Sequence, residues 1–400
     1  MLTAGIVCEY NPFHNGHLYQ MEKTRALLGE DTALVCVMSG DFVQRGEAAA
    51  FDKFARSDAA VRCGADLVLE LPLPWCLSSA EGFARGAVGL LGALGVTALS
   101  FGSETGELKA LEALAVLLAD PAFTERVKAR LASEPNLSFA AAREQEAARV
   151  CGDEAKILEQ PNDILAVEYL KAMRTLGLSM RPLAIKREGS GHDQPAAQGA
   201  LRSASEIRRL LREGRDVTGD IPAAALAVYR RETAQGRAIL DTDRLETAML
   251  SRLRQLREED CMDLPDAADG LGRRLYRAIR TESSLDAICL AAKSKRHPLA
   301  RIRRMALCAC LGVREGMAAG LPPYARPLAM NGRGRALLRE ISGTASVPIL
   351  TKPAAVHNLG GAAEKIFILC SSAHDFYALG CGQSAGIRPE EDWRKSPVIV

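Results

Sequence analysis

Two histidines near the start of the chain, His14 and His17, have the side-chain type and the spacing to act on a phosphate. On the first turn of a helix their imidazoles would share one face, and each could donate a hydrogen bond to a phosphate oxygen that gains negative charge during a reaction. Gly16 between them would let a nucleotide come close to the backbone. The pattern His-x-Gly-His therefore indicates an ATP site.

The segments on either side would have to position this pair. An apolar run from Ala4 to Cys8 predicts a strand, and the segment from Gly16 to Leu28 has the pattern of a helix. A strand, a short loop and a helix N-terminus would thus follow one another. We expect that terminus to offer a phosphate unpaired backbone N–H groups and the positive end of the helix dipole.

Two other interpretations of the histidine pair stay open on these residues alone. The pair could be half of a metal site, but no carboxylate or cysteine lies at ligand spacing nearby, so no metal ligand is assigned. The histidines could also be structural residues that cap a turn. Their position directly after the first predicted strand, with Asn11-Pro12-Phe13 as the intervening turn, favours the nucleotide site.

Length, net charge and cysteine content limit the classes of protein to which the chain could belong. The chain has 400 residues, enough for two or three domains, and its net charge of +2 gives no global argument for nucleic acid, so any basic surface must be local. Eleven cysteines without CxxC pairs are typical of reduced thiols. No secretory leader and no apolar run long enough to span a bilayer is found, so we expect a cytoplasmic protein without a membrane partner; no protein partner is evident.

Strand and helix patterns alternate up to about residue 215, which predicts an α/β fold with a parallel, doubly wound sheet. In such sheets ligands bind beyond the C-terminal ends of the strands. The expected strands are Ala4–Cys8, Thr32–Ser39, Ala65–Leu71, Val96–Phe101 and Pro182–Lys186.

Several polar segments are expected at that edge of the sheet. Ser39 to Gly46 is a turn-rich loop, Gly102-Ser103-Glu104 closes the fourth strand, and Asn162 precedes a helix over Ile164–Leu176. The helical pattern from Glu107 to about Ala148 is interpreted as an insertion in this first domain.

Beyond about Asp216 the alternation stops and helical patterns dominate. We expect residues 1–215 to form an ATP-binding domain and residues 216–400 a mainly α-helical domain. The last dozen residues are expected to be loosely held. The other elements expected in this half are short strands at Pro327–Asn331 and Val347–Thr351, a helix from Gly332 and a long helix over His357–Leu379.

The densest basic cluster of the sequence lies at the start of a predicted helix, Leu299–Leu311. It could contact RNA phosphates, or it could be an ordinary charged and solvated helix face. Its cations are Lys293, Lys295, Arg296, Arg301, Arg303 and Arg304.

Several of these stretches together resemble one family, the bacterial tRNA(Met) cytidine acetate ligases, in order over most of the chain. The His-x-Gly-His element is shared by the whole nucleotidyltransferase superfamily, whereas the loop Gly40–Gly46 and the strand that ends in Glu70-Leu71-Pro72 are more specific. The other stretches that carry the resemblance are Gly5–His17, Phe101–Glu104, Gln160–Asn162 and Lys186-Arg187.

The resemblance implies a Rossmann-like nucleotidyltransferase domain and a reaction in two steps. Acetate would attack the α-phosphate of ATP, with Mg²⁺, to give acetyl-adenylate, and the acetyl group would pass to N4 of the wobble cytidine of elongator tRNA(Met), forming N4-acetylcytidine. His14 and His17 would be catalytic. The family's ATP-binding positions map onto Val7, Cys8, Glu9, Tyr10, Asn11, Pro12, Phe13, His14, Asn15, Gly16, His17, Leu18, Tyr19, Gln20, Gly102, Asn162 and Arg187.

Three of these positions have competing interpretations. Arg187 could clamp a phosphate or form a surface ion pair. Asn162 could read adenine or ribose, or it could cap its helix. Gly102 could permit close approach of the nucleotide, or it could be a plain turn glycine.

The stretch Leu201 to Arg208 is expected to be a capped helix start and resembles the superfamily's second phosphate motif. Ala204 interrupts the pair of hydroxyls, which leaves Ser205 and Arg208 as candidates for a second phosphate contact.

Two other functions stay open. A cofactor-type adenylyltransferase would use the same His-x-Gly-His loop, but the long helical half and its basic cluster count against it. A tRNA- or ribosome-associated binding protein could keep the nucleotide fold without turnover, although intact His14, Gly16 and His17 would be unusual in such a protein.

Overall fold

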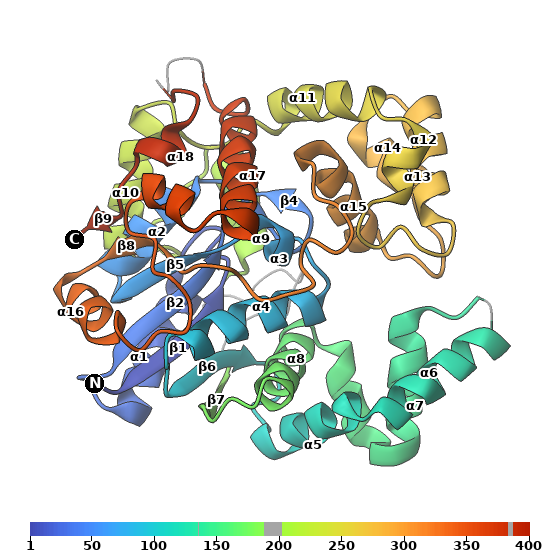
Figure 1. Ribbon diagram of the computed structural model, residues 1–400, viewed down its shortest axis with the longest axis horizontal. Helices are drawn as coiled ribbons and strands as arrows, with labels where there is room; N and C mark the ends of the chain where they lie inside the picture. The colour runs from blue at the N-terminus through green and yellow to red at the C-terminus, as the bar shows by residue number, and fades with distance from the viewer. Residues whose placement is uncertain (135, 188–201, 383–386) are drawn as a thin grey trace.

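The computed structural model describes residues 1–134, 136–187, 202–382 and 387–400. Within these residues a seven-stranded sheet runs through the molecule in the order β7-β6-β1-β2-β5-β8-β9, and β3 and β4 form a separate hairpin (Figure 1). The strands are β1 (Thr3–Cys8), β2 (Ala33–Ser39), β3 (Phe42–Val43), β4 (Glu47–Ala48), β5 (Leu67–Leu71), β6 (Ala98–Ser103), β7 (Arg181–Lys186), β8 (Arg326–Met330) and β9 (Val398–Ile399).

Helices surround the sheet, and α5–α7 and α11–α15 form two outlying groups at the right of Figure 1. No helix among the described residues has the length and apolar character to cross a membrane. The helices up to β8 are α1 (Asn15–Leu28), α2 (Lys53–Arg62), α3 (Leu73–Cys76), α4 (Ala80–Ala93), α5 (Leu108–Ala119), α6 (Pro121–Ser133), α7 (Phe139–Cys151), the 3-10 helix η1 (Gly152–Glu159), α8 (Pro161–Thr175), α9 (Ala204–Arg212), α10 (Ala223–Ala234), α11 (Thr242–Arg254), α12 (Glu258–Met262), α13 (Leu271–Thr281), α14 (Leu285–Ala292) and α15 (Leu299–Leu311). After β8 come α16 (Gly332–Ile341), the 3-10 helix η2 (Pro353–Asn358), α17 (Gly361–Ala378) and α18 (Glu391–Arg394).

The five strands expected from the sequence are present and parallel, so the predicted α/β fold is confirmed. From β1 the chain builds β2 and β5 on one side, and then returns to add β6 and β7 on the other side. The strand order therefore reverses beside β1. In open α/β sheets a ligand binds at this switch point, beyond the C-terminal ends of the strands.

Both faces of the central parallel strands β1, β2 and β5 are covered, which explains why their sequences are mostly apolar without alternation. The edge strand β7 is fully buried only at Leu183 and Ile185. β2 is buried along its whole length, and β1 is buried except at Val7. Gly5 of β1 has a packing reason, because a Cβ there would lie 2.6 Å from Cδ1 of Leu91 in α4. The glycine thus lets α4 lie directly on the strand.

The residues after 216 are mainly helical but also extend this sheet. β8 pairs antiparallel with β5, with Leu67 opposite Met330, and β9 pairs parallel with β8. The expected strand at Pro327–Asn331 and the helix from Gly332 are thereby confirmed. Because both halves share one sheet, the division into domains 1–215 and 216–400 stays a prediction about chain organisation.

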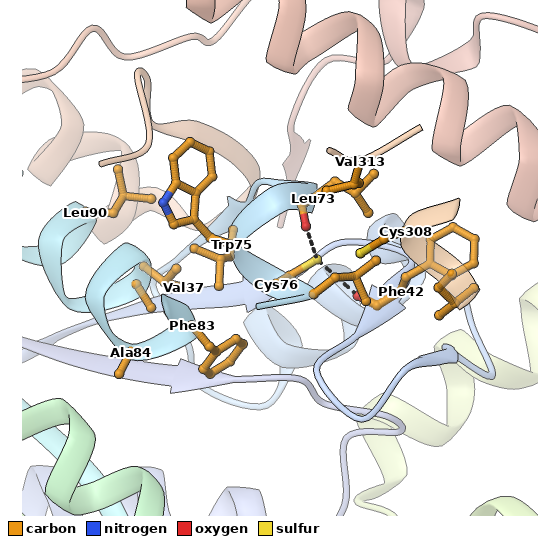
Figure 2. Close-up of a cluster of buried hydrophobic side chains, with 14 of the residues drawn as sticks. Val37, Phe42, Leu73, Trp75, Cys76, Phe83, Ala84, Leu90, Cys308 and Val313 are labelled. Carbon is orange, nitrogen blue, oxygen red and sulfur yellow. Dashed lines mark hydrogen bonds between the residues drawn. The ribbon is translucent and has the colours of Figure 1, made fainter. Parts of the chain in front are cut away.

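The two halves also share a hydrophobic cluster. Figure 2 shows Cys308 of α15 close to Cys76 and Phe42, which belong to the first half. The Cys76 thiol donates to the carbonyl oxygens of Leu73 and Phe42, at 3.3 and 3.4 Å, and so satisfies its own polar group inside the cluster. The helical group α11–α15 is therefore packed onto the first half of the chain through α15.

Three expectations for the C-terminal third were wrong. Val347–Thr351 is not a strand: it makes a single bridge from Ile349 to Ala325, and Pro348 beside it cannot donate to a ladder. The long helix begins at Gly361 rather than at His357, because Gly360 and Gly361 take left-handed backbone conformations. The last dozen residues are not loosely held, since Asp392 is completely buried.

Candidate nucleotide site

A cavity lies at the C-terminal ends of β6 and β7 and the N-terminal turn of α1, beside the switch point of the sheet. Six of the predicted ATP-binding residues line it: His14, Gly16, Tyr19, Gln20, Gly102 and Arg187. The other lining residues were not predicted as ATP-binding, namely Ile185, Lys186, Arg202 and Ser203. Basic, hydroxyl and imidazole groups therefore meet here, which is the chemistry that a polyphosphate requires.

The spacing of the His-x-Gly-His motif has a geometric reason. His14 is the N-cap of α1, and its Nδ1 accepts a hydrogen bond from the Gly16 N–H at 3.0 Å. Nδ1 of His17 in turn accepts from the His14 N–H at 3.2 Å. A Cβ on Gly16 would lie 2.9 Å from Cε1 of His14, so glycine leaves room for the ring. The motif is thus a reciprocal capping box with an imidazole at each end.

These two hydrogen bonds also fix the tautomer of each ring. A neutral imidazole that accepts at Nδ1 carries its proton at Nε2. Burial lowers the pKa of His17 well below 6.5, and the charges of His14 and Arg187 lower that pKa further, so His17 is neutral at neutral pH. The rings stack with their centroids 3.8 Å apart. Capping and donation to a phosphate are therefore compatible, because they use opposite nitrogens.

The expectation of unpaired N–H groups at the start of α1 was wrong. The Asn15 N–H donates to the carbonyl oxygen of Asp220 at 2.9 Å, and the Gly16 N–H donates to His14. The N–H groups of His17 and Leu18 both donate to the His14 carbonyl oxygen, at 2.9 and 3.2 Å. A phosphate at this terminus would thus meet side-chain donors and the helix dipole rather than open backbone donors.

Much of the predicted loop before α1 is held in the core. The Phe13 N–H donates to the Tyr229 hydroxyl at 2.8 Å, and Oδ1 of Asn11 accepts from the Ala50 N–H at 2.8 Å. A nucleotide contact at these positions would come from backbone atoms. Also buried in this segment are Cys8, Tyr10 and Pro12, and partly buried are Val7, Glu9, Asn15, His17 and Leu18.

Gly102 and Arg187 lie beside each other at the ends of β6 and β7. Gly102 is paired with Ile185 inside the sheet, so its interpretation as a turn glycine was wrong. A Cβ on Gly102 would be 3.6 Å from Cγ of Arg187, an ordinary contact, so packing within the protein does not demand glycine. Among the described residues, no carboxylate forms an ion pair with Arg187, which favours its phosphate-clamp interpretation.

Asn162 does not line the cavity but belongs to a clasp at its rim. The Glu104 carboxylate accepts from Nδ2 of Asn162 at 2.5 Å and from the Asp163 N–H at 2.9 Å. The Asp163 carboxylate accepts in return from the N–H groups of Glu104 and Thr105, at 3.0 and 3.2 Å, and from the Ser103 hydroxyl. This Glu104–Asp163 clasp joins the end of β6 to the start of α8. Asn162 donates here, so its interpretation as a helix cap was wrong.

The start of α9 brings a second set of hydroxyls to the cavity. Ser203 is the N-cap and accepts from the Glu206 N–H at 3.3 Å, and its Oγ lies 3.1 Å from that of Ser205, so Ala204 does not separate the pair. Leu201, where this element was expected to begin, lies outside the described residues. Arg208 lies elsewhere: it donates to the carbonyl oxygen of Asn11 at 2.8 Å and so supports the loop before α1.

A residue that the sequence analysis missed, Arg56 of α2, holds two loops of the site together. Its guanidinium is completely buried and donates to the carbonyl oxygens of Glu9 at 2.5 Å and Ser39 at 3.2 Å. The Glu9 carboxylate accepts from the Gln44 N–H at 2.7 Å, and burial raises its pKa. No local signal marks Arg56 in the sequence, because α2 also carries Lys53, Asp58 and Arg62.

The structure divides the basic cluster into two sets. Asp266 pairs with Arg301 and Arg304 at 3.7 and 3.5 Å, and Arg303 pairs with Asp286 at 3.2 Å. The arginines of α15 are therefore engaged within the protein. Lys293 and Lys295 are exposed and Arg296 is partly exposed, and no ion pair joins these three to other described residues. A prediction of RNA contact is thus best placed on the loop before α15.

The chain matches the family model of the HIGH nucleotidyl transferases over residues 1–388. It is 39% identical over 367 residues to the tRNA(Met) cytidine acetate ligase of Syntrophotalea carbinolica. This alignment covers 90% of the present chain and 86% of the relative. Identity to the protein of the same name from Syntrophomonas wolfei is 35% over 415 residues, covering 100% and 99% of the two chains.

Solved structures show the same similarity. The crystal structure of apo Thermotoga maritima TmcAL matches with a TM-score of 0.94 and 31% identity, covering 100% of both chains. The same protein bound with alpha-thio ATP matches with a TM-score of 0.92 and 31% identity, covering 100% of this chain and 99% of that one.

Proposed function

The chain belongs to the tRNA(Met) cytidine acetate ligases, within the HIGH nucleotidyl transferases, and we propose that it uses ATP to join acetate to N4 of the wobble cytidine of elongator tRNA(Met). The observation that carries this proposal is the His-x-Gly-His capping box beside a cavity at the switch point of the sheet. Its support is the similarity, over the whole chain, to a TmcAL crystallised with an ATP analogue.

The reaction has two balanced steps. A carboxylate oxygen of acetate attacks the α-phosphorus of ATP, and the bond from that phosphorus to the bridging oxygen of the β-phosphate breaks, giving acetyl-adenylate and pyrophosphate. The exocyclic N4 amine of cytidine then attacks the acetyl carbonyl carbon. AMP leaves, and the amine loses one proton to give N4-acetylcytidine. An acyl-adenylate is reactive enough that positioning the amine supplies much of the second step.

The residues at the cavity suit the first step. Negative charge grows on the phosphate oxygens during the attack, and the Nε2–H groups of His14 and His17 are the donors for it. His14 lines the cavity, whereas His17 is not among the lining residues and lies behind it, stacked on the His14 ring. Arg187, exposed at the end of β7, is the clamp for the phosphates. The hydroxyl of Ser203 is available for a second phosphate contact from the start of α9.

Mg²⁺ fits this site only as part of the nucleotide. The described residues that line the cavity include no carboxylate, and Mg²⁺ needs oxygen ligands in octahedral geometry. The polar side chains of the lining are basic, hydroxyl, imidazole and, at Gln20, amide groups instead. We therefore place Mg²⁺, when present, on the ATP phosphates and water, and we assign it no protein ligand.

The expected substrates and compartment belong to the same proposal. The partners are acetate and elongator tRNA(Met), with the basic loop before α15 as a candidate contact to the RNA. A reducing cytoplasm is supported by the cysteines, all eleven of which lie in the described part of the chain as free thiols.

The test is incorporation of labelled acetate into RNA in the presence of ATP and Mg²⁺. Elongator tRNA(Met) is compared with a transcript in which only the wobble cytidine is changed. We expect label in the first RNA and none in the second, with AMP and pyrophosphate formed in step with acetylation.

Two outcomes would overturn the proposal. Release of pyrophosphate with a phosphorylated small molecule, without label in either RNA, would favour a cofactor-type adenylyltransferase. Binding of ATP without turnover under any of these conditions would favour a binding protein.

A further inference from the structure

Helix α13 has an exposed face made of arginine. Its four cations, Arg273, Arg274, Arg277 and Arg280, are exposed and fall within about 120° of one another around the helix. The opposite face is buried and carries Leu271, Leu275, Ala278 and Ile279, and the helix has no acidic residue.

Three of these arginines have contacts that orient the face. Arg273 pairs with Glu258 of α12 at 3.3 Å, and Arg280 donates to carbonyl oxygens at the end of α11, including that of Arg254 at 3.0 Å. Arg274 donates to the carbonyl oxygens of Ala292 and Lys293, at 3.1 and 2.9 Å. Of the four side chains, only the guanidinium of Arg277 has neither an ion pair nor a hydrogen bond among the described residues.

The contacts of Arg274 place α13 directly beside the loop that precedes α15. That loop carries Lys293, Lys295 and Arg296, none of which is ion-paired to another described residue. Five cations from two separate segments thus lie on one continuous part of the surface. We call it the α13 surface and define it as Arg274, Arg277, Lys293, Lys295 and Arg296.

We propose that the α13 surface binds the sugar–phosphate backbone of the tRNA substrate. This inference rests on the proposed function and adds to it the surface that holds the RNA. Charge complementarity supports it: the chain as a whole is nearly neutral, whereas this surface presents cations without partner carboxylates. Contacts to phosphates set affinity and orientation, while selection of the cytidine takes place elsewhere.

The α13 surface is connected to the nucleotide site through α15 and the β3–β4 hairpin. The hairpin meets α15 so closely that a Cβ on Gly46 would lie 2.5 Å from the backbone nitrogen of Arg304. Glu47 of the same hairpin pairs with Arg208 at 3.3 Å and with Arg303 at 3.8 Å. An RNA bound on the α13 surface is thus held by elements that pack against the loops of the cavity.

The test measures tRNA binding as a function of salt for Arg277→Gln, for Lys295→Gln and for the double variant. The logarithm of the association constant falls linearly with the logarithm of the salt concentration, and each lost phosphate contact makes this slope shallower by about 0.7 to 0.9. The slope of the double variant should therefore be shallower by about 1.5. Arg335→Gln is the matched control, because Arg335 is an exposed arginine on α16, at the opposite side of the molecule in Figure 1. It should leave both affinity and slope unchanged.

A second readout separates this inference from the proposed function. Acetate-dependent exchange of pyrophosphate into ATP, measured without tRNA, should be the same in the variants as in the unmodified protein. Acetyl transfer should show a higher KM for tRNA with an unchanged kcat.

The proposal that the α13 surface binds tRNA would be overturned if the double variant and the unmodified protein had the same tRNA affinity and the same salt dependence. It would also be overturned if Arg335→Gln lost as much tRNA affinity as the double variant. Absence of acetate-dependent exchange in the unmodified protein would overturn the proposed function instead, while the binding measurement would still decide the surface. Lys295 lies in an exposed loop, so its variant remains informative if Arg277→Gln were to unfold α13.

Discussion

At the residue scale, the two histidines show that a structural and a catalytic interpretation can both hold. Each ring uses Nδ1 to accept a backbone N–H, which completes the first turn of α1. The same bond leaves the proton at Nε2, the nitrogen that can serve a phosphate. The capping alternative raised by the sequence was therefore correct as geometry, and it does not compete with a role in adenylation.

Because Nδ1 of each ring caps the helix and Nε2 is left for the phosphate, the two roles can be separated by substitution. His14→Asn and His17→Gln keep side-chain acceptors suited to an N-cap and to the third position of a capping box, but they remove the imidazole donors. We expect unfolding free energies within about 1 kcal/mol of the unmodified protein. Acetate-dependent pyrophosphate exchange should fall about a hundredfold or more, since loss of one such donor costs about 2.7 to 4 kcal/mol.

Thermal unfolding and exchange kinetics on the same preparations check both parts. Near-normal exchange in either variant would show that its imidazole serves only the cap. Loss of stability in proportion to loss of activity would show that the substituted side chains do not rebuild the capping box.

At the element scale, the Glu104–Asp163 clasp explains why two distant stretches, Phe101–Glu104 and Gln160–Asn162, belong to one resemblance. Each carboxylate accepts from backbone N–H groups on the other side of the clasp. The separation between the end of β6 and the start of α8 is thereby fixed. Gly102 and Asn162, both predicted ATP-binding positions, lie on the two sides.

The clasp predicts the effect of Asp163→Asn. The NH₂ group of the new amide would face one of the backbone N–H groups from which the Asp163 carboxylate now accepts a hydrogen bond. That N–H group would lose its acceptor, and an unsatisfied buried donor costs about 1 to 3 kcal/mol. We expect the KM for ATP to rise about tenfold, because the rim of the cavity is displaced. Steady-state exchange kinetics at varied ATP concentration measure this.

The matched control is Glu107→Gln, three residues beyond Glu104, where the side chain is exposed. It should leave the KM for ATP unchanged. An unchanged KM in Asp163→Asn would mean that the clasp stabilises the fold without positioning the nucleotide.

At the scale of the whole molecule, a buried network of charges ties the C-terminal segment to the sheet. Lys53 Nζ lies 2.8 Å from Glu70 and 2.6 Å from Asp392, and Arg326 contacts the same two carboxylates at 2.9 Å. His374 of α17 extends the network. Its Nδ1 lies 2.8 Å from Asp41, and its Nε2 lies 3.2 Å from Glu391.

The network gives stability a defined pH dependence. Burial alone would lower the pKa of His374, but Asp41 and then Glu391 raise it to about 10. Because the folded pKa lies above the unfolded value of 6.5, this contribution is complete below about pH 6.5 and is lost as pH rises toward 10. We expect the unfolding free energy to fall by about 2 to 4 kcal/mol between about pH 6.5 and pH 9.

Urea unfolding at fixed pH values measures this fall. His374→Gln should be less stable at about pH 6 and should lack most of the decline. His357→Gln, at an exposed histidine paired with Glu364, is the matched control and should follow the unmodified protein. A flat profile in the unmodified protein, or an equal decline in His374→Gln, would contradict this account.

The sequence by itself determined the parallel strands and the loop that carries His14 and His17. It also determined the resemblance to the tRNA(Met) cytidine acetate ligases, which implies ATP-dependent acetylation of a cytidine. Local information suffices for these features: apolar runs report burial on both faces, and the His-x-Gly-His spacing fits a single helical turn. The same information places Arg187 at the end of β7, beside the cavity.

Only the tertiary structure decided which charged groups are already engaged. Arg56, Arg301 and Arg304 look like surface cations in the sequence, yet their partners come from segments 17 to 47 residues away. Asp392 was expected in a loose end, but it meets Lys53 across 339 residues. Whether a charge is left for a ligand depends on the counter-charges and carbonyl groups that folding brings to it. That outcome depends on contacts between distant segments, which no local pattern records.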